Sequence, residues 1–333
     1  MEAIDTTYDV SDYFYLQGFN TQGIDNIIVD ATSPGGGITR LTQSSTDLSV
    51  GDTYMDTNGH LWVSWTDWSN LNSMISDSNT ISLLPAAINM SPENDGFDND
   101  QASCILRDQN GTLWLVYSVG ISTYSESVYI RSYTSGVLGE RHQVAQIAGT
   151  NREADLVQHS DGSYSLFFSA SDSIYSASSW HGFITHSDDL ISWTTPTQVT
   201  TTWGRLTRMT LDNEDNLYAL IDNNDQGLKI SKSEDGITWS SPITLTSGHY
   251  GDIYYSASLG KLFVAYFNPA DNNIWIRDTT DGITWSTPWL AVDRTASSAT
   301  ECRICEDDQG RLLVTYMDNV GGHNDLFIIS ISV

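Results

Sequence analysis

Basic side chains are scarce in this chain. Its 333 residues contain 14 Lys and Arg against 42 Asp and Glu, which gives a net charge of −28 at pH 7. A chain of this charge repels the phosphates of nucleic acids and anionic lipids, so binding to nucleic acid through a basic patch is excluded. The acidic residues are spread along the sequence without an acidic tail. This pattern predicts a folded acidic surface and leaves a high-salt, halophilic setting open.

Long apolar runs and a secretory leader are also missing. No stretch approaches the roughly 18 apolar residues that a membrane-spanning helix needs, so we expect no membrane span. The first residues, MEAIDTTYDVSDYFYLQG, lack the basic and apolar regions of a Sec signal peptide. The protein either stays inside the cell or leaves by another route, such as lysis or virion assembly. We expect it on a virion surface or outside the cell.

Cysteine is rare, with Cys104, Cys302 and Cys305 as its three occurrences. The Cys302-x-x-Cys305 spacing is also found in redox and zinc sites. However, the surrounding TECRICEDD is typical of a strand, in which residues i and i+3 point to opposite faces. No second such pair and no nearby His pair completes a zinc site. We therefore predict three buried free thiols.

Two local patterns recur at intervals of about 50 residues. The strings SDDLISWTTP, SEDGITWSSP and TTDGITWSTP place Trp193, Trp239 and Trp285 46 residues apart. A second pattern, a strand, a short Asn/Asp/Gly turn and another strand, occurs six times. Its turns are centred on Gly59, Gly111, Gly162, Asp215, Gly260 and Gly310. Repeats of this length with four short strands predict an all-β protein, a six-bladed β-propeller of four-stranded antiparallel blades.

The ends of the chain suggest how the ring closes. The last repeat stops one strand short, and residues 37–43, GITRLTQ, are typical of a strand. We expect this N-terminal strand to close the last blade, because an unpaired edge strand invites aggregation. Residues 21–333 would form one propeller domain. Residues 1–20 would form an arm or anchor that joins the protein to a larger assembly.

The three Trp-containing strings resemble the Asp-box, or BNR, repeats of sialidase-like β-propellers. Ser233, Asp235, Gly236, Thr238 and Trp239 match that pattern in kind, with one residue fewer between Asp and Gly. The resemblance implies a propeller fold, and a family that includes hydrolases, lyases and pure binders. We assign the strings a structural role at the outer rim, in which Asp accepts backbone N–H groups and Trp packs between sheets. The residues in this role are Asp189, Trp193, Asp235, Trp239, Asp281 and Trp285.

The first strands of the repeats begin with arginines, carboxylates and aromatics. Aligned on the hairpin turns, these residues would meet at the central channel, on the face that carries the more variable loops. Arginines and aromatics suit an oxygen-rich, acidic sugar. In the alternative interpretation, the same residues form ion pairs that tie blade to blade. The predicted ligand-binding residues are Arg152, Arg205, Arg208, Tyr250, Arg303, Trp180 and Trp203.

A glycosidase would also need two carboxylates flanking one pocket. The candidates are Asp52, Glu153, Asp155 and Glu301. We expect no cofactor and no catalytic metal. The stretch PENDGFDNDQ, residues 92–101, has the oxygen content of a loose Ca²⁺ loop but not the spacing of an EF-hand, so a structural Ca²⁺ stays an option there.

Two functional classes remain. The first is a non-catalytic recognition propeller on a virion or cell surface that binds a glycan or a glycosylated surface protein. The second is a sialidase-like glycoside hydrolase or a polysaccharide lyase that acts on an acidic glycan. The loops rich in Ser, Thr, Tyr and Trp and the separate N-terminal arm favour recognition.

Overall fold

The computed structural model describes most of the chain after residue 37. The described ranges are 38–45, 47–56, 58–67, 72–78, 84, 87–92, 101–122, 125–144, 147, 149–171, 180–199, 205–223, 227–293, 301–320 and 322–333. The predicted arm, Trp203 and most of the proposed Ca²⁺ loop therefore lie outside the described residues.

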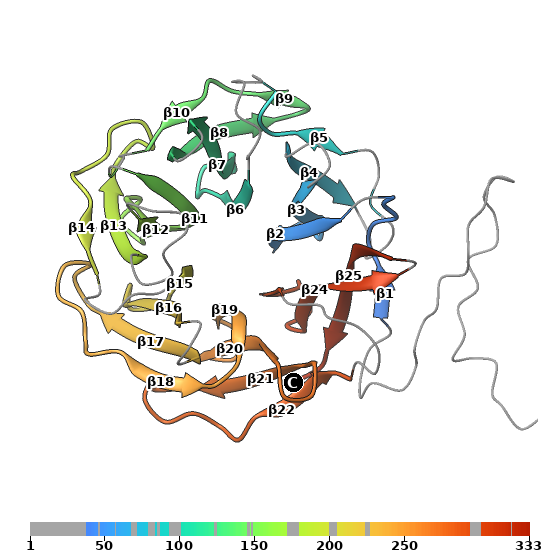
Figure 1. The fold of residues 1–333 in the computed structure, drawn as a ribbon. Coiled ribbons are helices and arrows are strands. Elements are labelled where there is room, and N and C mark those ends of the chain that lie inside the picture. Colours follow the sequence, from blue (N-terminus) through green and yellow to red (C-terminus); the bar gives the residue numbers. More distant parts are fainter. Residues whose placement is uncertain are drawn as a thin grey trace, which may run out of the picture.

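The described residues form an all-β propeller around a central axis (Figure 1). Each repeat contributes strands in four successive positions, here named A to D from the centre outward. The A strands are β2 (Leu48–Met55), β6 (Gln101–Arg107), β11 (Thr150–Gln158), β15 (Arg205–Leu211), β19 (His249–Ser256) and β23 (Cys302–Glu306). Each A strand contacts the next, and β23 contacts β2, so the six A strands form a closed circle.

The B and C strands pair antiparallel outside the circle of A strands. The B strands are β3 (Leu61–Asp67), β7 (Leu113–Ser122), β12 (Tyr164–Ser171), β16 (Leu217–Asn223), β20 (Lys261–Asn268) and β24 (Leu312–Val320). The C strands are β4 (Asn72–Ser78), β8 (Ser125–Thr134), β13 (His181–Ser187), β17 (Gly227–Ser233), β21 (Asn273–Thr279) and β25 (His323–Ile331). Because the strands alternate in direction, the A–B and C–D turns share one face and the B–C loops and D–A connections share the other.

The outer D strands are short. They are β5 (Ile88–Asn89), β9 (Val137–Leu138), β10 (His142–Gln143), β14 (Thr197–Gln198), β18 (Ile243–Thr246) and β22 (Trp289–Val292). In the last blade this place is taken by β1 (Ile38–Arg40), which pairs antiparallel with β25 through Ile38–Ile329. The predicted closure by an N-terminal strand is thus confirmed.

The predicted set of six separate four-stranded blades needs correction. Strand pairing gives four four-stranded blades and one nine-stranded sheet that contains β6 to β14. The two halves of that sheet join because β8 and β11 run parallel and pair at Glu126 and Thr150. The buried Asn151 side chain strengthens this join by donating to the Glu126 carbonyl at 3.0 Å.

The hairpin turns form as the sequence predicts. All six turn positions, from Gly59 to Gly310 and including Asp215, have positive φ, which explains the preference for glycine there. An aspartate precedes four of these turns. Asp56, for example, accepts the N–H groups of Asn58 and His60 at 2.9 and 3.0 Å and holds the turn closed.

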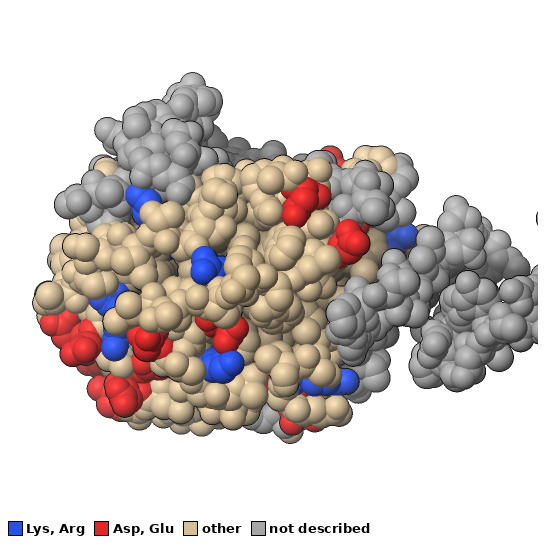
Figure 2. Space-filling view, turned by 90° about the horizontal axis from the view of Figure 1, so that it is seen from below, with Lys and Arg blue, Asp and Glu red and all other residues tan. Residues whose placement is uncertain are grey.

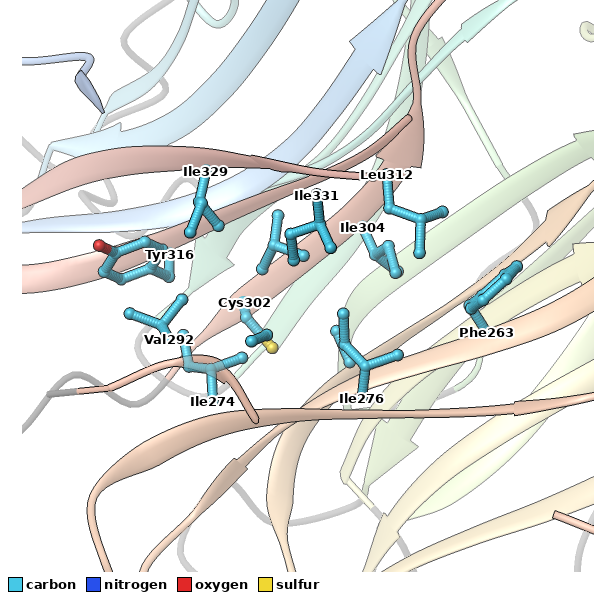
Figure 3. Close-up of a cluster of buried hydrophobic side chains, with 13 residues drawn as sticks. Phe263, Ile274, Ile276, Val292, Cys302, Ile304, Leu312, Tyr316, Ile329 and Ile331 are labelled. Carbon is cyan, nitrogen blue, oxygen red and sulfur yellow. The ribbon is translucent and has the colours of Figure 1, made fainter. Parts of the chain in front are cut away.

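Hydrophobic side chains fill the spaces between neighbouring units. One such cluster, shown in Figure 3, joins β20 and β21 to β23 and β24 through Phe263, Ile276, Cys302 and Leu312. Cys302 lies in this cluster and Cys305 in the next one, so the pair does point to opposite faces. All three cysteines are buried free thiols, as predicted.

Candidate functional site at the centre of the propeller

One residue from each A strand occupies the same register position at the centre. Each of these residues pairs with a residue in the middle of its B strand, which defines a set that we call the inner ring. The inner-ring residues are Asp52, Cys104, Asp155, Arg208, Asp252 and Arg303. The repeat therefore brings together four residues that the sequence selected from strands far apart in the chain, Asp52, Asp155, Arg208 and Arg303.

The three inner-ring aspartates connect neighbouring A strands. Each uses one carboxylate oxygen to accept an N–H from the next A strand, at 2.7 to 2.8 Å. The donors are Ile105 for Asp52, Met209 for Asp155 and Ile304 for Asp252. The other oxygen of each carboxylate accepts the N–H of its own following residue, at 2.7 to 3.0 Å. These contacts match the alternative prediction, in which the central polar residues tie blade to blade.

Burial raises the pKa of these carboxyl groups. The pKa of Asp52 rises to about 8, mainly through burial and then through repulsion by Asp155 and Asp252. The pKa of Asp155 rises to about 6 by burial, against the attraction of Arg208. Asp252 also has a raised pKa because of its burial, although Arg303 and Arg208 both lower it. The inner ring thus contains an aspartate that is largely protonated at neutral pH.

Several predicted ligand-binding residues make contacts within the protein. Arg303 donates to the carbonyl oxygens of Gly51 at 2.5 Å, Cys302 at 2.7 Å and Val50 at 3.0 Å, and so ties the last unit to the first. The Nε of Arg208 lies 4.0 Å from Asp252.

Arg152 forms an ion pair with Glu126 through two nitrogens, and its guanidinium lies 5.9 Å from the ring centre of Trp180. Trp180 is buried. Arg205 is the first residue of β15, so its backbone lies at the same end of the A strands as Arg152, near the start of β11.

A second group lies at the N-terminal ends of the A strands. It comprises Glu153, His249, Tyr250 and Glu301, and we call it the central cluster. Glu153 and Tyr250 have φ of 52° and 53°, in the left-handed region that non-glycine residues rarely adopt. Both lie at equivalent irregularities, where the pairing of β11 and of β19 shifts before Asp155 and before Asp252. The same local backbone geometry therefore positions the side chains of Glu153 and Tyr250.

Hydrogen bonds position three of the four residues of the central cluster, His249, Tyr250 and Glu301. The buried Asp222 accepts the N–H of Tyr250 at 2.7 Å and lies 3.0 Å from Nδ1 of His249. Glu301 accepts a hydrogen bond from the Ser49 hydroxyl at 2.6 Å. Asp222 and His249 are not among the residues predicted from the sequence. The acidic residue within the apolar strand LYALIDN was the available signal.

The three Trp-containing strings lie on the opposite face, in the C–D turns. Asp235 accepts the N–H groups of Ile237 at 2.8 Å and Thr238 at 2.6 Å, and Trp239 stacks on Phe167 of the neighbouring unit. Asp189 and Asp281 make the same turn contacts. These backbone hydrogen bonds lower the pKa of Asp189 and of Asp235 to about 2. Their geometry agrees with a structural role.

The described residues contain no group of three or more His, Cys, Asp or Glu side chains placed to hold a metal ion. Within the same residues, no helix is long and apolar enough to cross a membrane. In the view of Figure 2, most of the acidic side chains gather toward one edge of the molecule, with basic ones among them.

Comparison with known proteins places the chain in the β-propeller class by its fold. No protein-family model and no curated protein matches the sequence. A solved structure of a protein of unknown function from Dyadobacter fermentans superposes with a TM-score of 0.72 at 15% identity, over 89% of this chain and 98% of that one.

Two further solved structures are glycan-acting enzymes. A Penicillium chrysogenum α-L-arabinanase in complex with arabinobiose gives a TM-score of 0.67 at 12% identity, over 90% of this chain and 98% of that one. A Fusarium graminearum α-L-arabinofuranosidase gives 0.62 at 12% identity, over 86% and 92%. At these identities the likeness concerns the fold. None of these three structures is described as a sialidase, so the sialidase-like resemblance stays a prediction.

Proposed function

We propose that this protein binds a glycan at the central cluster. The observation that carries the proposal is the left-handed conformation of Glu153 and Tyr250 at equivalent positions of two A strands. Such a conformation costs on the order of 1–3 kcal/mol in a non-glycine residue and is concentrated at functional sites. The side chains presented there, two carboxylates, a tyrosine and a histidine, suit the hydroxyls and the apolar face of a sugar ring.

The fold likeness supports a glycan ligand. The similar solved structures include an α-L-arabinanase and an α-L-arabinofuranosidase, both in complex with saccharides or sugar mimics, and a polysaccharide lyase at a TM-score of 0.50. In this proposal the protein recognises its glycan without cleaving it. Each inner-ring aspartate has both oxygens engaged by backbone N–H groups, which favours a scaffolding role over catalysis.

We also infer that the nine-stranded sheet acts as two blades, which gives six units around the centre. Its two halves pack against each other through a hydrophobic cluster that includes Val116 and Ile130 from one half and Leu166 and Phe168 from the other. A single paired position, Glu126–Thr150, joins them.

The Tyr250→Gly variant tests the proposed site. Glycine accepts a φ of 53° without strain, so we expect an unfolding free energy within about 1 kcal/mol of the wild type. Glycan binding on a mixed glycan array should be lost, because the tyrosine ring is removed. Ser135→Gly is the matched control, since Ser135 has a φ of 50° in the C–D turn of the opposite face. Equal binding by wild type and Tyr250→Gly would exclude the central cluster as the glycan site.

A glycoside hydrolase or polysaccharide lyase is the second candidate. The observation in its favour is the pair of raised pKa values, about 8 for Asp52 and about 6 for Asp155, because a general acid must be protonated at the working pH. Mass spectrometry of every bound glycan after incubation separates the two functions. Cleaved products that disappear in Asp155→Asn would establish the enzyme, whereas intact glycans support recognition.

A further inference from the structure

The charge around the central cluster decides which kind of glycan it accepts, given the proposed glycan binding. Acidic sugars carry carboxylate or sulfate groups, and proteins recognise these mainly with arginine side chains. The inner ring and its surroundings contain Arg152, Arg208 and Arg303, so an acidic ligand was the prediction from sequence. The contacts of these three arginines within the protein favour a different ligand class.

Each of the three arginines is engaged inside the protein. Arg303 donates three hydrogen bonds to backbone carbonyl oxygens and is buried. Arg152 is buried in its two-nitrogen pairing with Glu126. Arg208, also buried, lies beside Asp252 and interacts with the carboxyl groups of Asp155, Asp52 and Glu153. Freeing any of them for a ligand would leave a buried carboxylate or carbonyl without its partner.

Carboxyl groups outnumber the arginines at this place. Glu153 and Glu301 belong to the central cluster, and Asp52, Asp155 and Asp252 belong to the inner ring. Repulsion by Asp155 and Asp252 adds to the effect of burial in raising the pKa of Asp52, as expected where carboxyl groups lie near one another. These five carboxyl groups surround two arginines, Arg208 and Arg303, at the centre of the propeller. An anionic sugar would be repelled here.

We infer that the central cluster takes a neutral saccharide, whose hydroxyls donate to Glu153 and Glu301 while Tyr250 packs against the sugar ring. An ionised carboxylate only accepts hydrogen bonds, so it matches a sugar hydroxyl and not another carboxylate. This inference rests on the proposed function and specifies its ligand class.

Isothermal titration calorimetry at pH 7 with four probes tests the inference. Linear arabino-oligosaccharide and β-1,4-galacto-oligosaccharide are the neutral probes; oligogalacturonate and sialyllactose are the acidic ones. At least one neutral probe should bind with an affinity that changes less than about twofold between 50 and 500 mM NaCl. Both acidic probes should bind at least about tenfold more weakly. Glu301→Gln should weaken the neutral probe about tenfold. The control Glu234→Gln, an exposed carboxylate of a C–D turn, should not.

The outcomes separate the inference from the proposed function. Tighter binding of an acidic probe, with an affinity that falls as salt rises, would overturn the neutral-ligand inference and leave glycan binding intact. Binding of none of the four probes would count against both. A neutral probe that binds Glu301→Gln as tightly as the wild type would remove the carboxylate–hydroxyl contact from the site and overturn the inference in the form stated.

Discussion

At the residue scale, the inner-ring aspartates show how one residue type can connect strands and still oppose folding. The carboxylate of Asp52 accepts two backbone N–H groups, and yet its burial makes the charged form unfavourable. The folded protein therefore keeps a proton on Asp52 at pH values where the unfolded chain has lost it. The contribution of Asp52 to folding stability must therefore fall as pH rises, whereas the contribution of a carboxylate in an ordinary surface salt bridge increases as pH rises.

We predict that Asp52→Asn flattens this pH dependence. The pKa of Asp52 is about 8 in the folded state and 3.8 as the reference value, so the folded state binds more protons between these limits. The unfolding free energy of the wild type should fall as pH rises from about 4 to 8, with a slope of at most about 1.4 kcal/mol per pH unit from this group. Urea unfolding at pH 5, 6.5 and 8 measures the slope. An unchanged slope in Asp52→Asn would show that Asp52 ionises normally.

At the element scale, the C–D turns and the A strands have separate tasks. The turn at Asp235 is held by backbone hydrogen bonds, and its tryptophan packs on Phe167 of the preceding unit. Glycine is needed at Gly236 because its φ is 70° and a Cβ there would approach His186 to 2.8 Å. The turns therefore fasten neighbouring sheets on the face opposite to the central cluster.

Trp239→Ala should reduce stability without changing glycan binding. Truncating a largely buried tryptophan costs roughly 3 kcal/mol, through the loss of packing against Phe167 and the cavity that remains. Chemical denaturation measures the loss, and titration with the best-binding glycan measures affinity on the folded fraction. A variant that unfolds like the wild type and binds no glycan would place the binding site at this turn.

At the scale of the whole molecule, several contacts between the first and last units close the ring. The guanidinium of Arg303 holds the carbonyls of Val50 and Gly51, and the strand β1 completes the sheet of β23 to β25. Buried Asp325 binds Arg40, the Thr42 hydroxyl at 3.1 Å and the Ser44 N–H at 2.8 Å. Display on a virion or cell surface, and assembly through residues 1–20, stay predictions about the chain beyond this closed ring.

Deleting residues 1–43 should open the ring, whereas deleting residues 1–20 should not. The longer deletion removes the buried Leu41 and two of the three partners of Asp325, Arg40 and Thr42, and it exposes the edge of β25. We expect the unfolding free energy to fall by about 4–6 kcal/mol and aggregation to increase. Thermal unfolding and size-exclusion chromatography check both effects. Equal stability of the two deletion variants would show that β1 is dispensable for closure.

The repeat, the turns and the closure follow from local preferences in the sequence. Six hairpins with positive φ at their centres, three Asp–Trp turns and a strand that precedes the first repeat were all predictable, because hydrogen-bonding and steric preferences at these positions are local. The order of polar residues at the starts of the A strands also placed Asp52, Asp155, Arg208 and Arg303 in one ring.

The partners of these residues, in contrast, depend on tertiary packing. Arg152 pairs with Glu126, Arg303 with backbone carbonyls of the first unit, and His249 with Asp222, across separations of 26 to 253 residues. Tertiary packing also joins β8 to β11 in one sheet. A sequence pattern shows which residue types recur at one position of the repeat. Which carboxylate or carbonyl lies within 3 Å of an arginine depends on how neighbouring units pack. The role of these arginines in ligand binding stays a prediction.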